Sequence, residues 1–187
     1  MKYLIAGLGN MGADYDDTRH NVGFNVLDIL AEGGKAEWAH KKLGDLTNIK
    51  YRGRNIVLLK PSTYMNRSGK AIQYWLQKEK IKPENVFVIV DDLNIDFGRM
   101  RIRAKGSDGG HNGLRDIENY IGTNYARLRI GIGIGNQFSG GGQVNFVLGK
   151  WTDEEKTELP QLLDKATKAA KAFTHIGINR TMSQFNN

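Results

Sequence analysis

The sequence of 187 residues contains no cysteine. This absence excludes a disulfide framework, a thiolate nucleophile and any zinc or iron–sulfur site with cysteine ligands. Long hydrophobic runs are also missing, because the longest purely apolar stretch, Val86–Val90, is far shorter than the roughly 20 residues of a membrane-spanning helix. The N-terminal residues carry a short apolar patch that runs into a glycine turn, which is typical of a first strand and not of a signal peptide. We therefore expect a cytoplasmic protein with no membrane partner.

Several common catalytic motifs are absent as well. No Gly-x-Ser-x-Gly segment presents a serine nucleophile, and the histidines at positions 20, 40, 111 and 175 lack a metal-ligand spacing such as His-Glu-x-x-His. The segment Gly7–Gly12 matches Gly-x-Gly-x-x-Gly, but acidic residues follow it where a dinucleotide site needs the start of a helix. We therefore expect neither a metal nor a cofactor.

The composition is that of a folded, basic protein. Hydrophobic residues make up 40% of the chain, which is enough for a core, and at roughly 150 residues per domain the length predicts a single domain over residues 1–187. The 27 Lys and Arg residues outnumber the 20 Asp and Glu residues, so the net charge is +7. Such a charge attracts polyanions, nucleic acid first, although it could also serve solubility alone.

Hydrophobic patterns alternate between strands and helices along the chain. Strands are expected at Lys2–Leu8, Leu46–Tyr51, Asn55–Lys60, Val86–Val90, Met100–Lys105 and Arg127–Ile134. Helices are expected after the caps Asn21, Asn112 and Thr152, and over about Gly69–Lys80. This alternation predicts an α/β fold with a mixed, mostly parallel, twisted sheet packed between helices. Ligands of such folds gather beyond the carboxyl ends of strands, which directs attention to the polar loops after Leu8, Lys60 and Val90, the last of them Asp91–Gly98.

Two residues in these regions suggest acid–base chemistry. His20 precedes the first expected helix, and Asp91 directly follows the strand Val86–Val90. A carboxylate that binds one imidazole nitrogen fixes the tautomer and leaves the other nitrogen free to take a proton. Since no other nucleophile is evident, water is the expected one, and the pair suits hydrolysis of an activated carbonyl such as an ester. The alternatives are a surface or capping role for His20 and a turn for Asp91.

Asparagine is concentrated in the same loops, at Asn10, Asn66 and Asn112. Asparagine amides both donate and accept, so they can bind a peptide backbone or stabilise a developing oxyanion. Each of them alone is equally explained by a turn or a helix cap. As a set, they favour a substrate-binding interpretation.

Basic residues recur at every second position of one expected strand. They are Arg99, Arg101, Arg103 and Lys105, and Arg127 and Arg129 repeat the period on a later strand. In a strand this spacing places the cations on one face. Because like charges on one face repel, we favour contact with phosphates over a merely solvated edge.

Together these features resemble the bacterial-type peptidyl-tRNA hydrolase family. The resemblance rests on GLGNMGADYDDTRHNVGF (7–24), KPSTYMNRSGKAI (60–72), DDLNIDFGRMRIRAKGSDGGHNGLRDI (91–117), RLRIGIG (127–133) and VLGKW (147–151). These segments span nearly the whole chain, and they are specific as a combination. The resemblance implies a single α/β domain that hydrolyses the ester between a peptide and the 3′-terminal ribose of tRNA, with no metal or cofactor.

Carried over by position, the resemblance implies that His20 is the general base and that Asp91 orients it. It implies substrate contacts for Asn10, Tyr15, Met65, Asn66, His111 and Asn112, with Asn66 also catalytic through the carbonyl oxygen. It further implies a clamp on the tRNA phosphate by Arg103 and Arg129, and the basic strand face adds Arg101 and Lys105. The main alternative is a non-catalytic RNA-binding relative with the same fold, and a second is an esterase for small molecules.

A few positions depart from the family pattern. Met11 stands where proline is usual, Asn94 where a second acidic residue is common, and Ile134-Gly135 where a basic residue and proline are common. These departures bear on loop geometry and tRNA affinity, and no catalytic position is among them. The glycine-rich segment Gly135–Gln143 is the candidate lid over the substrate. Since no long exposed heptad pattern is present, we expect a monomer.

Overall fold

The computed structural model describes residues 1–133 and 141–186. Within these residues, seven strands form one sheet with the order β2-β3-β4-β1-β5-β7-β6. The strands are β1 (Lys2–Gly7), β2 (Ala39–Lys41), β3 (Gly44–Tyr51), β4 (Arg54–Pro61), β5 (Val86–Asp96), β6 (Met100–Arg103) and β7 (Ala126–Gly133). The α-helices are α1 (Val22–Gly33), α2 (Ser68–Glu79), α3 (Asn112–Ile121), α4 (Gln143–Val147), α5 (Asp153–Ile176) and α6 (Ile178–Phe185). Three of the short 3-10 helices matter below: η1 (Ala13–Tyr15), η2 (Arg19–Asn21) and η3 (Met65–Arg67).

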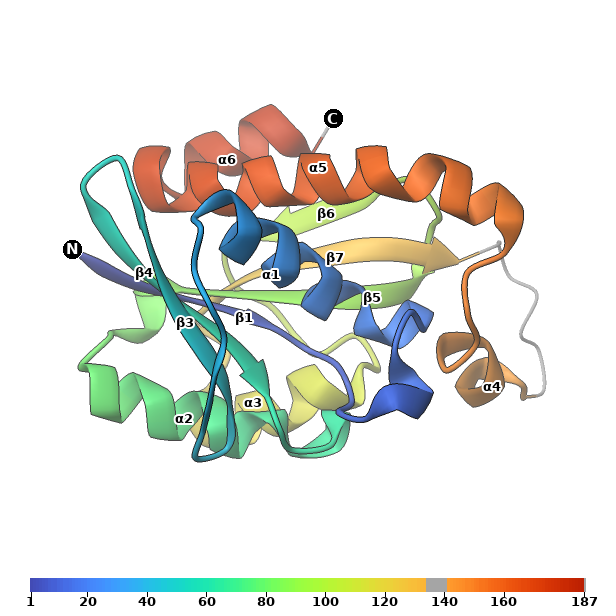
Figure 1. The fold of residues 1–187 in the computed structure, drawn as a ribbon, viewed down its shortest axis with the longest axis horizontal. Helices are drawn as coiled ribbons and strands as arrows, with labels where there is room; N and C mark the ends of the chain where they lie inside the picture. The colour runs from blue at the N-terminus through green and yellow to red at the C-terminus, as the bar shows by residue number, and fades with distance from the viewer. Residues whose placement is uncertain (134–140, 187) are drawn as a thin grey trace.

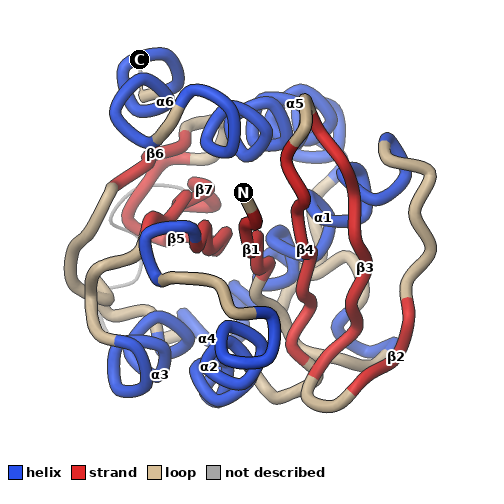
Figure 2. The backbone as a smooth tube through the Cα atoms, turned by 90° about the vertical axis from the view of Figure 1, so that its left-hand side faces the viewer, coloured by secondary structure: helices blue, strands red, loops and turns tan. Residues whose placement is uncertain are grey.

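The sheet is mixed, with a parallel centre and antiparallel edges. Strands β4, β1, β5 and β7 are parallel neighbours, whereas β2, β3 and β6 pair antiparallel with theirs. Helices α1, α5 and α6 cover one face, and α2 and α3 cover the other (Figures 1 and 2). The α/β class predicted from the sequence is therefore confirmed, and its parallel part is the middle of the sheet. No helix in the described part of the chain has the length and apolar character needed to span a membrane.

Strand patterning follows the position of each strand in the sheet. The apolar run Val86–Val90 of β5 is fully buried because helices cover this central strand on both faces. In the edge strand β6, Met100 and Ile102 point into the core, whereas Arg101 and Arg103 are exposed. The predicted segregation of cations and apolar side chains is confirmed for Arg101 and Arg103, whereas Arg99 and Lys105 lie outside this strand.

Two glycines bring the first helix directly against the first strand. A Cβ on Gly7 would lie 2.3 Å from the carbonyl oxygen of Gly23, and a Cβ on Gly23 would lie 2.7 Å from the amide nitrogen of Leu8. Neither position can therefore accept a side chain without moving the helix. This close approach places η2, which immediately precedes α1, beside the carboxyl ends of the central strands.

The structure corrects the expected loop at Asp91–Gly98. Strand β5 continues through this segment to Asp96 and pairs with β7, with an irregularity in register between Asp92 and Asp96. The backbone fits because Gly131 and Gly133 of β7 have no side chains: a Cβ on either would lie within 2.2 Å of a β5 carbonyl oxygen. Asp91 is therefore fixed within a strand and does not belong to a turn.

The predicted caps differ in outcome. Asn21 is the N-cap residue of α1, as predicted, but its side chain makes no capping hydrogen bond there and binds Asn10 instead. The prediction for Asn112 is wrong. Asn112 is the first residue of α3, and the capping side chain is that of His111. The third prediction, Thr152 as the cap of α5, is confirmed by a complete capping box with Glu155.

The sequence patterns did not predict β2, α4 or α6. The proposed lid begins in residues 134–140, which lie outside the described part of the chain, and its last residue, Gln143, begins α4. The sequence also predicted that this last strand ends at Ile134, which lies outside the described residues; the described part of β7 ends at Gly133.

The free edge of β6 is covered by a side chain from the C-terminal segment. The amide of Asn186 accepts a hydrogen bond from the Ile102 N–H at 2.7 Å and donates one to the Ile102 carbonyl at 3.0 Å. A side-chain amide thus satisfies both backbone groups of this residue, as a neighbouring strand would.

Candidate active site

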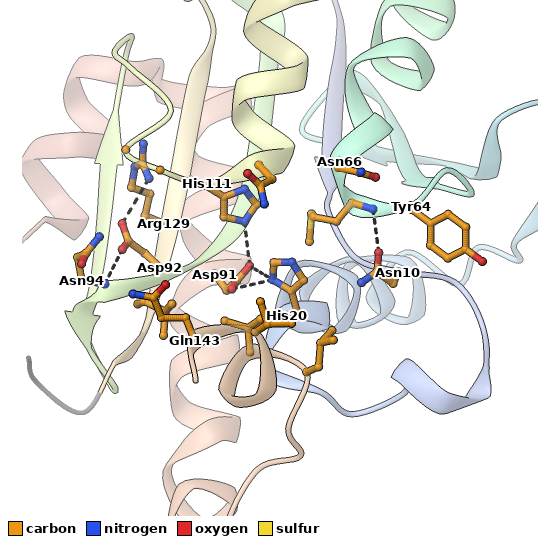
Figure 3. A pocket seen from close by; sticks show the side chains of 18 residues that line it. Asn10, His20, Tyr64, Asn66, Asp91, Asp92, Asn94, His111, Arg129 and Gln143 are labelled. Carbon is orange, nitrogen blue, oxygen red and sulfur yellow. Dashed lines mark hydrogen bonds and ion pairs between the residues drawn. The ribbon is translucent and has the colours of Figure 1, made fainter. Parts of the chain in front are cut away.

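A cavity of about 390 Å³ opens beyond the end of β1, beside the second half of β5 and where η3 and α3 begin. The residues expected to be functional converge on it from distant parts of the sequence (Figure 3). It is lined by the predicted residues Asn10, His20, Met65, Asn66, Asp91, His111, Asn112 and Arg129. The polar segments that follow Leu8, Lys60 and Val90 therefore lie around one cavity, with the one change that Asp91 belongs to a strand.

His20 and Asp91, which are 71 residues apart in the sequence, are in direct contact. The Nδ1 atom of His20 lies 2.8 Å from both carboxylate oxygens of Asp91. An ionised carboxylate can only accept, so Nδ1 carries the proton and donates it. In the neutral ring, Nε2 is then an acceptor, and no hydrogen bond joins it to another residue in the described part of the chain.

His111 also binds Asp91, but through Nε2 and therefore as the other tautomer. Its Nδ1 accepts hydrogen bonds from the N–H groups of Gly113 and Leu114, at 3.1 and 3.3 Å, and so caps α3. Because Nδ1 must be unprotonated to accept, Nε2 carries the proton and donates it to Asp91 Oδ1 at 3.0 Å. Both nitrogens of this ring are therefore occupied, in contrast to those of His20.

These contacts determine the charge of Asp91, which is only 2% exposed. Burial raises the pKa of its carboxyl group, but the charge of His20 and the hydrogen bonds from His111 and His20 outweigh burial and leave the pKa well below its ordinary value. Asp91 is therefore an anion throughout the neutral range. A fixed negative charge at this position stabilises the imidazolium that forms when His20 takes a proton.

The same three residues form a group that could be considered for a metal ion. Within the described residues, the ligand atoms of His20, Asp91 and His111 lie within 4.8 Å of one another. Metal binding at Nε2 of His111 would require its proton to move to Nδ1, where it would face the two N–H groups of the α3 cap. The donor set is therefore suited to a hydrogen-bonded group, and it does not fit a metal centre.

Asn10 connects the end of β1 to η3. Its backbone N–H and carbonyl are both bound by the side chain of Asn21, at 2.8 and 2.9 Å. Its side-chain oxygen accepts from the Met65 N–H at 2.8 Å, so its amide N–H groups are left for a ligand. Met65 is buried, whereas the adjacent Asn66 is exposed at the cavity. The asparagines at 10 and 66 thus differ: one fixes the backbone and the other presents its side chain.

Other cavity residues escaped the sequence analysis. Tyr64 is 64% exposed and stands at the rim, and Val144, 68% exposed, belongs to α4 together with Val147. Leu148 follows directly and completes an apolar wall. A short helix with no buried residue gives no clear hydrophobic periodicity, so only the unusual exposure of apolar side chains could have indicated it.

The remaining predicted residues lie in different settings. Tyr15 is half-buried in η1 and is not among the residues that line the cavity. Arg129 lines the cavity, where it pairs with Asp92 at 3.4 Å and donates to the Ser107 carbonyl at 2.8 Å. Arg101 is its direct neighbour across the β6–β7 ladder, and Arg103 and Lys105 are exposed farther along.

Arg127 corrects the expectation of a phosphate-facing cation on β7. Its side chain is only 1% exposed, pairs with Glu118 of α3 at 3.3 Å and lies over the Tyr125 ring at 4.1 Å. A fully buried, paired guanidinium fixes α3 against the sheet and cannot reach a nucleic acid.

Comparisons with known proteins agree with this geometry. The sequence profile of the family described as Peptidyl-tRNA hydrolase matches residues 4–187. The chain is 53% identical to the peptidyl-tRNA hydrolase of Bacteroides fragilis, over all of this chain and 99% of that one. It is 49% identical to that of Porphyromonas gingivalis over the full length of both.

Solved structures give the same result for the fold. The crystal structure of peptidyl-tRNA hydrolase from Acinetobacter baumannii is 36% identical in sequence and superposes with a TM-score of 0.90, covering 98% of this chain and 94% of the other. A peptidyl-tRNA hydrolase in complex with N-propanol gives a TM-score of 0.92 at 35% identity, with the same coverage. From the profile match, the identity across the whole chain and the shared fold, it follows that this chain belongs to the peptidyl-tRNA hydrolase family.

Proposed function

We propose that this protein hydrolyses the ester that joins a peptide to the 3′-terminal ribose of tRNA, and so releases the tRNA for reuse. The observation that carries the proposal is the His20–Asp91 contact at the cavity, which leaves Nε2 of His20 as an acceptor. The peptidyl-tRNA hydrolases to which the chain is similar supply the substrate class. These relatives do not support the alternative of a non-catalytic RNA-binding protein.

The chemistry follows from the tautomers. Nε2 of His20 removes a proton from a water molecule, whose oxygen attacks the ester carbonyl, while Asp91 stabilises the imidazolium. The Asn66 amide, exposed at the cavity, donates to the carbonyl oxygen as negative charge develops there. When the tetrahedral intermediate collapses, the imidazolium returns its proton to the departing ribose oxygen. The products are a peptide with a free carboxyl group and a tRNA with a free hydroxyl, and no cofactor takes part.

Substrate binding is assigned to both polar and cationic residues around the cavity. Asn10, Asn112 and Met65 contact the peptide end, with Tyr15 at the margin of the site. His111 contributes to this end through Asp91. Arg101, Arg103, Arg129 and Lys105 are the cations proposed for the tRNA phosphates, on the β6–β7 side of the cavity. Arg129 is already partly neutralised by Asp92, so the exposed residues of β6 are expected to contribute more to affinity.

We further propose that the protein acts in the cytoplasm as a monomer and as a single domain over residues 1–187. The monomer rests on the sequence, which contains no long exposed heptad pattern. A light-scattering measurement of the mass in solution tests the monomer.

Hydrolysis of peptidyl-tRNA, compared with aminoacyl-tRNA and with and without a chelator, tests the activity. General-base catalysis contributes about 10²–10⁴-fold, so His20→Ala is expected to remove nearly all turnover, whereas a chelator leaves it unchanged. The chain offers a matched control in His40, whose Nδ1 binds Asp45 at 2.7 Å in another histidine–aspartate pair, exposed and away from the cavity. His40→Ala is expected to keep wild-type turnover. A His20→Ala enzyme that cleaves at a near wild-type rate would refute the assignment.

A comparison of two substrates separates the tRNA-specific enzyme from a general esterase. If the enzyme requires tRNA, a small peptidyl ester is expected to be cleaved far more slowly than peptidyl-tRNA, because it lacks the phosphates for the basic strand. Equal values of kcat/KM for the two substrates would contradict the proposed substrate class.

A further inference from the structure

The side chain of Arg19, next to His20 in η2, points away from the catalytic pair and is almost fully buried. Its Nε and Nη2 atoms donate to the two carboxylate oxygens of Glu155, at 3.1 and 2.8 Å. Such a bidentate, buried pair has a fixed geometry. Glu155 is itself held by the start of α5, because its Oε2 also accepts the Thr152 N–H at 2.8 Å.

The same guanidinium contacts the segment that forms the apolar wall of the cavity. Nη1 of Arg19 donates to the Phe146 carbonyl at 3.2 Å, and the guanidinium carbon lies 4.2 Å from the centre of the Phe146 ring. The Arg19 backbone N–H also binds the Gly149 carbonyl at 3.0 Å. One residue therefore joins η2, α4 and the N-terminus of α5.

This connection matters because the hydrophobic core holds α4 only in part. None of its residues is fully buried, and Phe146 and Val147 are its partly buried side chains that pack against the core. It nevertheless supplies Val144 and Val147 to the cavity that contains His20. The distance between the base and the apolar wall therefore depends on polar contacts as well as on this partial packing, and Arg19 makes several of the polar contacts.

We propose that Arg19 is a positioning residue that, through Glu155 and Phe146, holds α4 as the wall against which the peptide part of the substrate packs. The substrate named here rests on the proposed function, whereas the placement of α4 does not. Loss of these contacts is expected to weaken substrate binding and to leave the chemistry of His20 and Asp91 in place, because Arg19 touches neither side chain.

The test must separate positioning from simple stability. Arg19→Met keeps the length of the side chain but leaves the Glu155 carboxylate buried without its partner, which destabilises the fold. The double variant Arg19→Met/Glu155→Gln removes that unpaired charge, and glutamine retains the capping box with Thr152. It is therefore expected to melt near the wild-type temperature. Glu154→Gln, at the exposed neighbouring position, is the matched control for the loss of one carboxylate.

Two measurements are made on the folded double variant. Hydrogen exchange without substrate reports the order of α4, through amides such as Phe146 N–H, which binds the Gly142 carbonyl, and Leu148 N–H, which binds the Val144 carbonyl. We expect these amides to exchange at least about tenfold faster than in the wild type, with α3 unchanged. Steady-state hydrolysis of peptidyl-tRNA is expected to show a KM raised about tenfold, with kcat changed by less than about threefold and an unchanged pH profile.

Two outcomes overturn the proposal. Wild-type exchange in α4 of the double variant shows that Arg19 does not hold the helix, and an unchanged KM with a loosened α4 shows that the wall does not serve the substrate. Hydrogen exchange is measured without substrate, so its result on α4 holds even if the wild-type protein does not cleave peptidyl-tRNA. Failure of the wild type to cleave would instead contradict the proposed function.

Discussion

The imidazole of His111 donates from Nε2 to Asp91 Oδ1 at 3.0 Å while its Nδ1 caps α3. Asp91 is thereby shared by two histidines with different roles. His20 uses one nitrogen for the carboxylate and keeps the other as an acceptor, whereas His111 uses both nitrogens within the fold. These contacts support the proposal that His20 is the base and that His111 orients Asp91.

Removal of the Asp91 charge is expected to affect turnover more than binding. In Asp91→Asn the shape is kept, but the amide can present N–H groups to His20 and favour the wrong tautomer, so kcat is expected to fall by about 10²–10⁴-fold with little change in KM. Single-turnover hydrolysis of peptidyl-tRNA separates the two effects. A KM that rises as much as kcat falls would show that Asp91 acts mainly in substrate binding.

Two substitutions at His111 separate its two functions. Asparagine is a good N-cap but is too short to reach Asp91 as well, so His111→Asn is expected to lower kcat and to lose the stability that comes from the hydrogen bond to the buried Asp91 carboxylate. His111→Ala removes the cap too and is expected to be less stable than His111→Asn by about a further 0.5–2 kcal/mol. Urea unfolding and kcat are measured on both variants. Equal kcat for His111→Asn and the wild type would show that the contact with Asp91 is dispensable.

The depressed pKa of Asp91 predicts a particular dependence of stability on pH. In the unfolded chain this carboxyl titrates near its ordinary value of 3.8, and in the folded protein it titrates lower, because His20 and His111 stabilise its charge. Its contribution to stability is therefore fully present above pH 3.8 and is lost as the pH falls from there toward the folded-state pKa. Urea unfolding of the wild type and of Asp91→Asn below pH 5 checks this. The free energy of unfolding of the wild type minus that of the variant is expected to be constant down to about pH 4 and to decrease at lower pH. A constant difference through pH 3 contradicts the predicted titration.

The exposed cations of β6 are expected to control the salt dependence of tRNA binding. Each phosphate contact contributes about 0.7–0.9 to the slope of log K against log salt, so Arg101→Ala and Arg103→Ala should each reduce the slope by about that amount. Lys168→Ala is the control, since Lys168 pairs with Asp164 on α5, across the sheet from the arginines. Affinity is measured by filter binding over a series of salt concentrations. An unchanged slope removes that residue from the phosphate contacts.

The sequence predicted the fold class and the grouping of the site because both follow from local patterns. The period-2 arrangement around Ile102 predicts a strand with one charged face, and the apolar run Val86–Val90 predicts a strand buried on both faces that leads directly to Asp91. Family resemblance then selected His20 from the four histidines. These features need no knowledge of which helix packs where.

Features that depend on tertiary contacts could not be predicted from local sequence patterns. Arg127 and Arg129 have the same spacing, but only the packing of α3 makes the first a buried partner of Glu118. Similarly, His111 and Asn112 can both cap a helix, and a shift of one residue in the helix start decides between them. The extension of β5 beyond Asp91 depends on glycines of a strand some 40 residues later.

The amide of Asn186, which occupies both backbone groups of Ile102, has a consequence for the molecule in solution. An open ladder on β6 would be a template onto which a strand of another chain could add, and fibril growth begins in this way. Asn186 blocks this pairing at Ile102, and its two hydrogen bonds also stabilise the strand that carries Arg101 and Arg103. A C-terminal tag or truncation that displaces Asn186 is therefore expected to promote self-association and to weaken the proposed binding of tRNA.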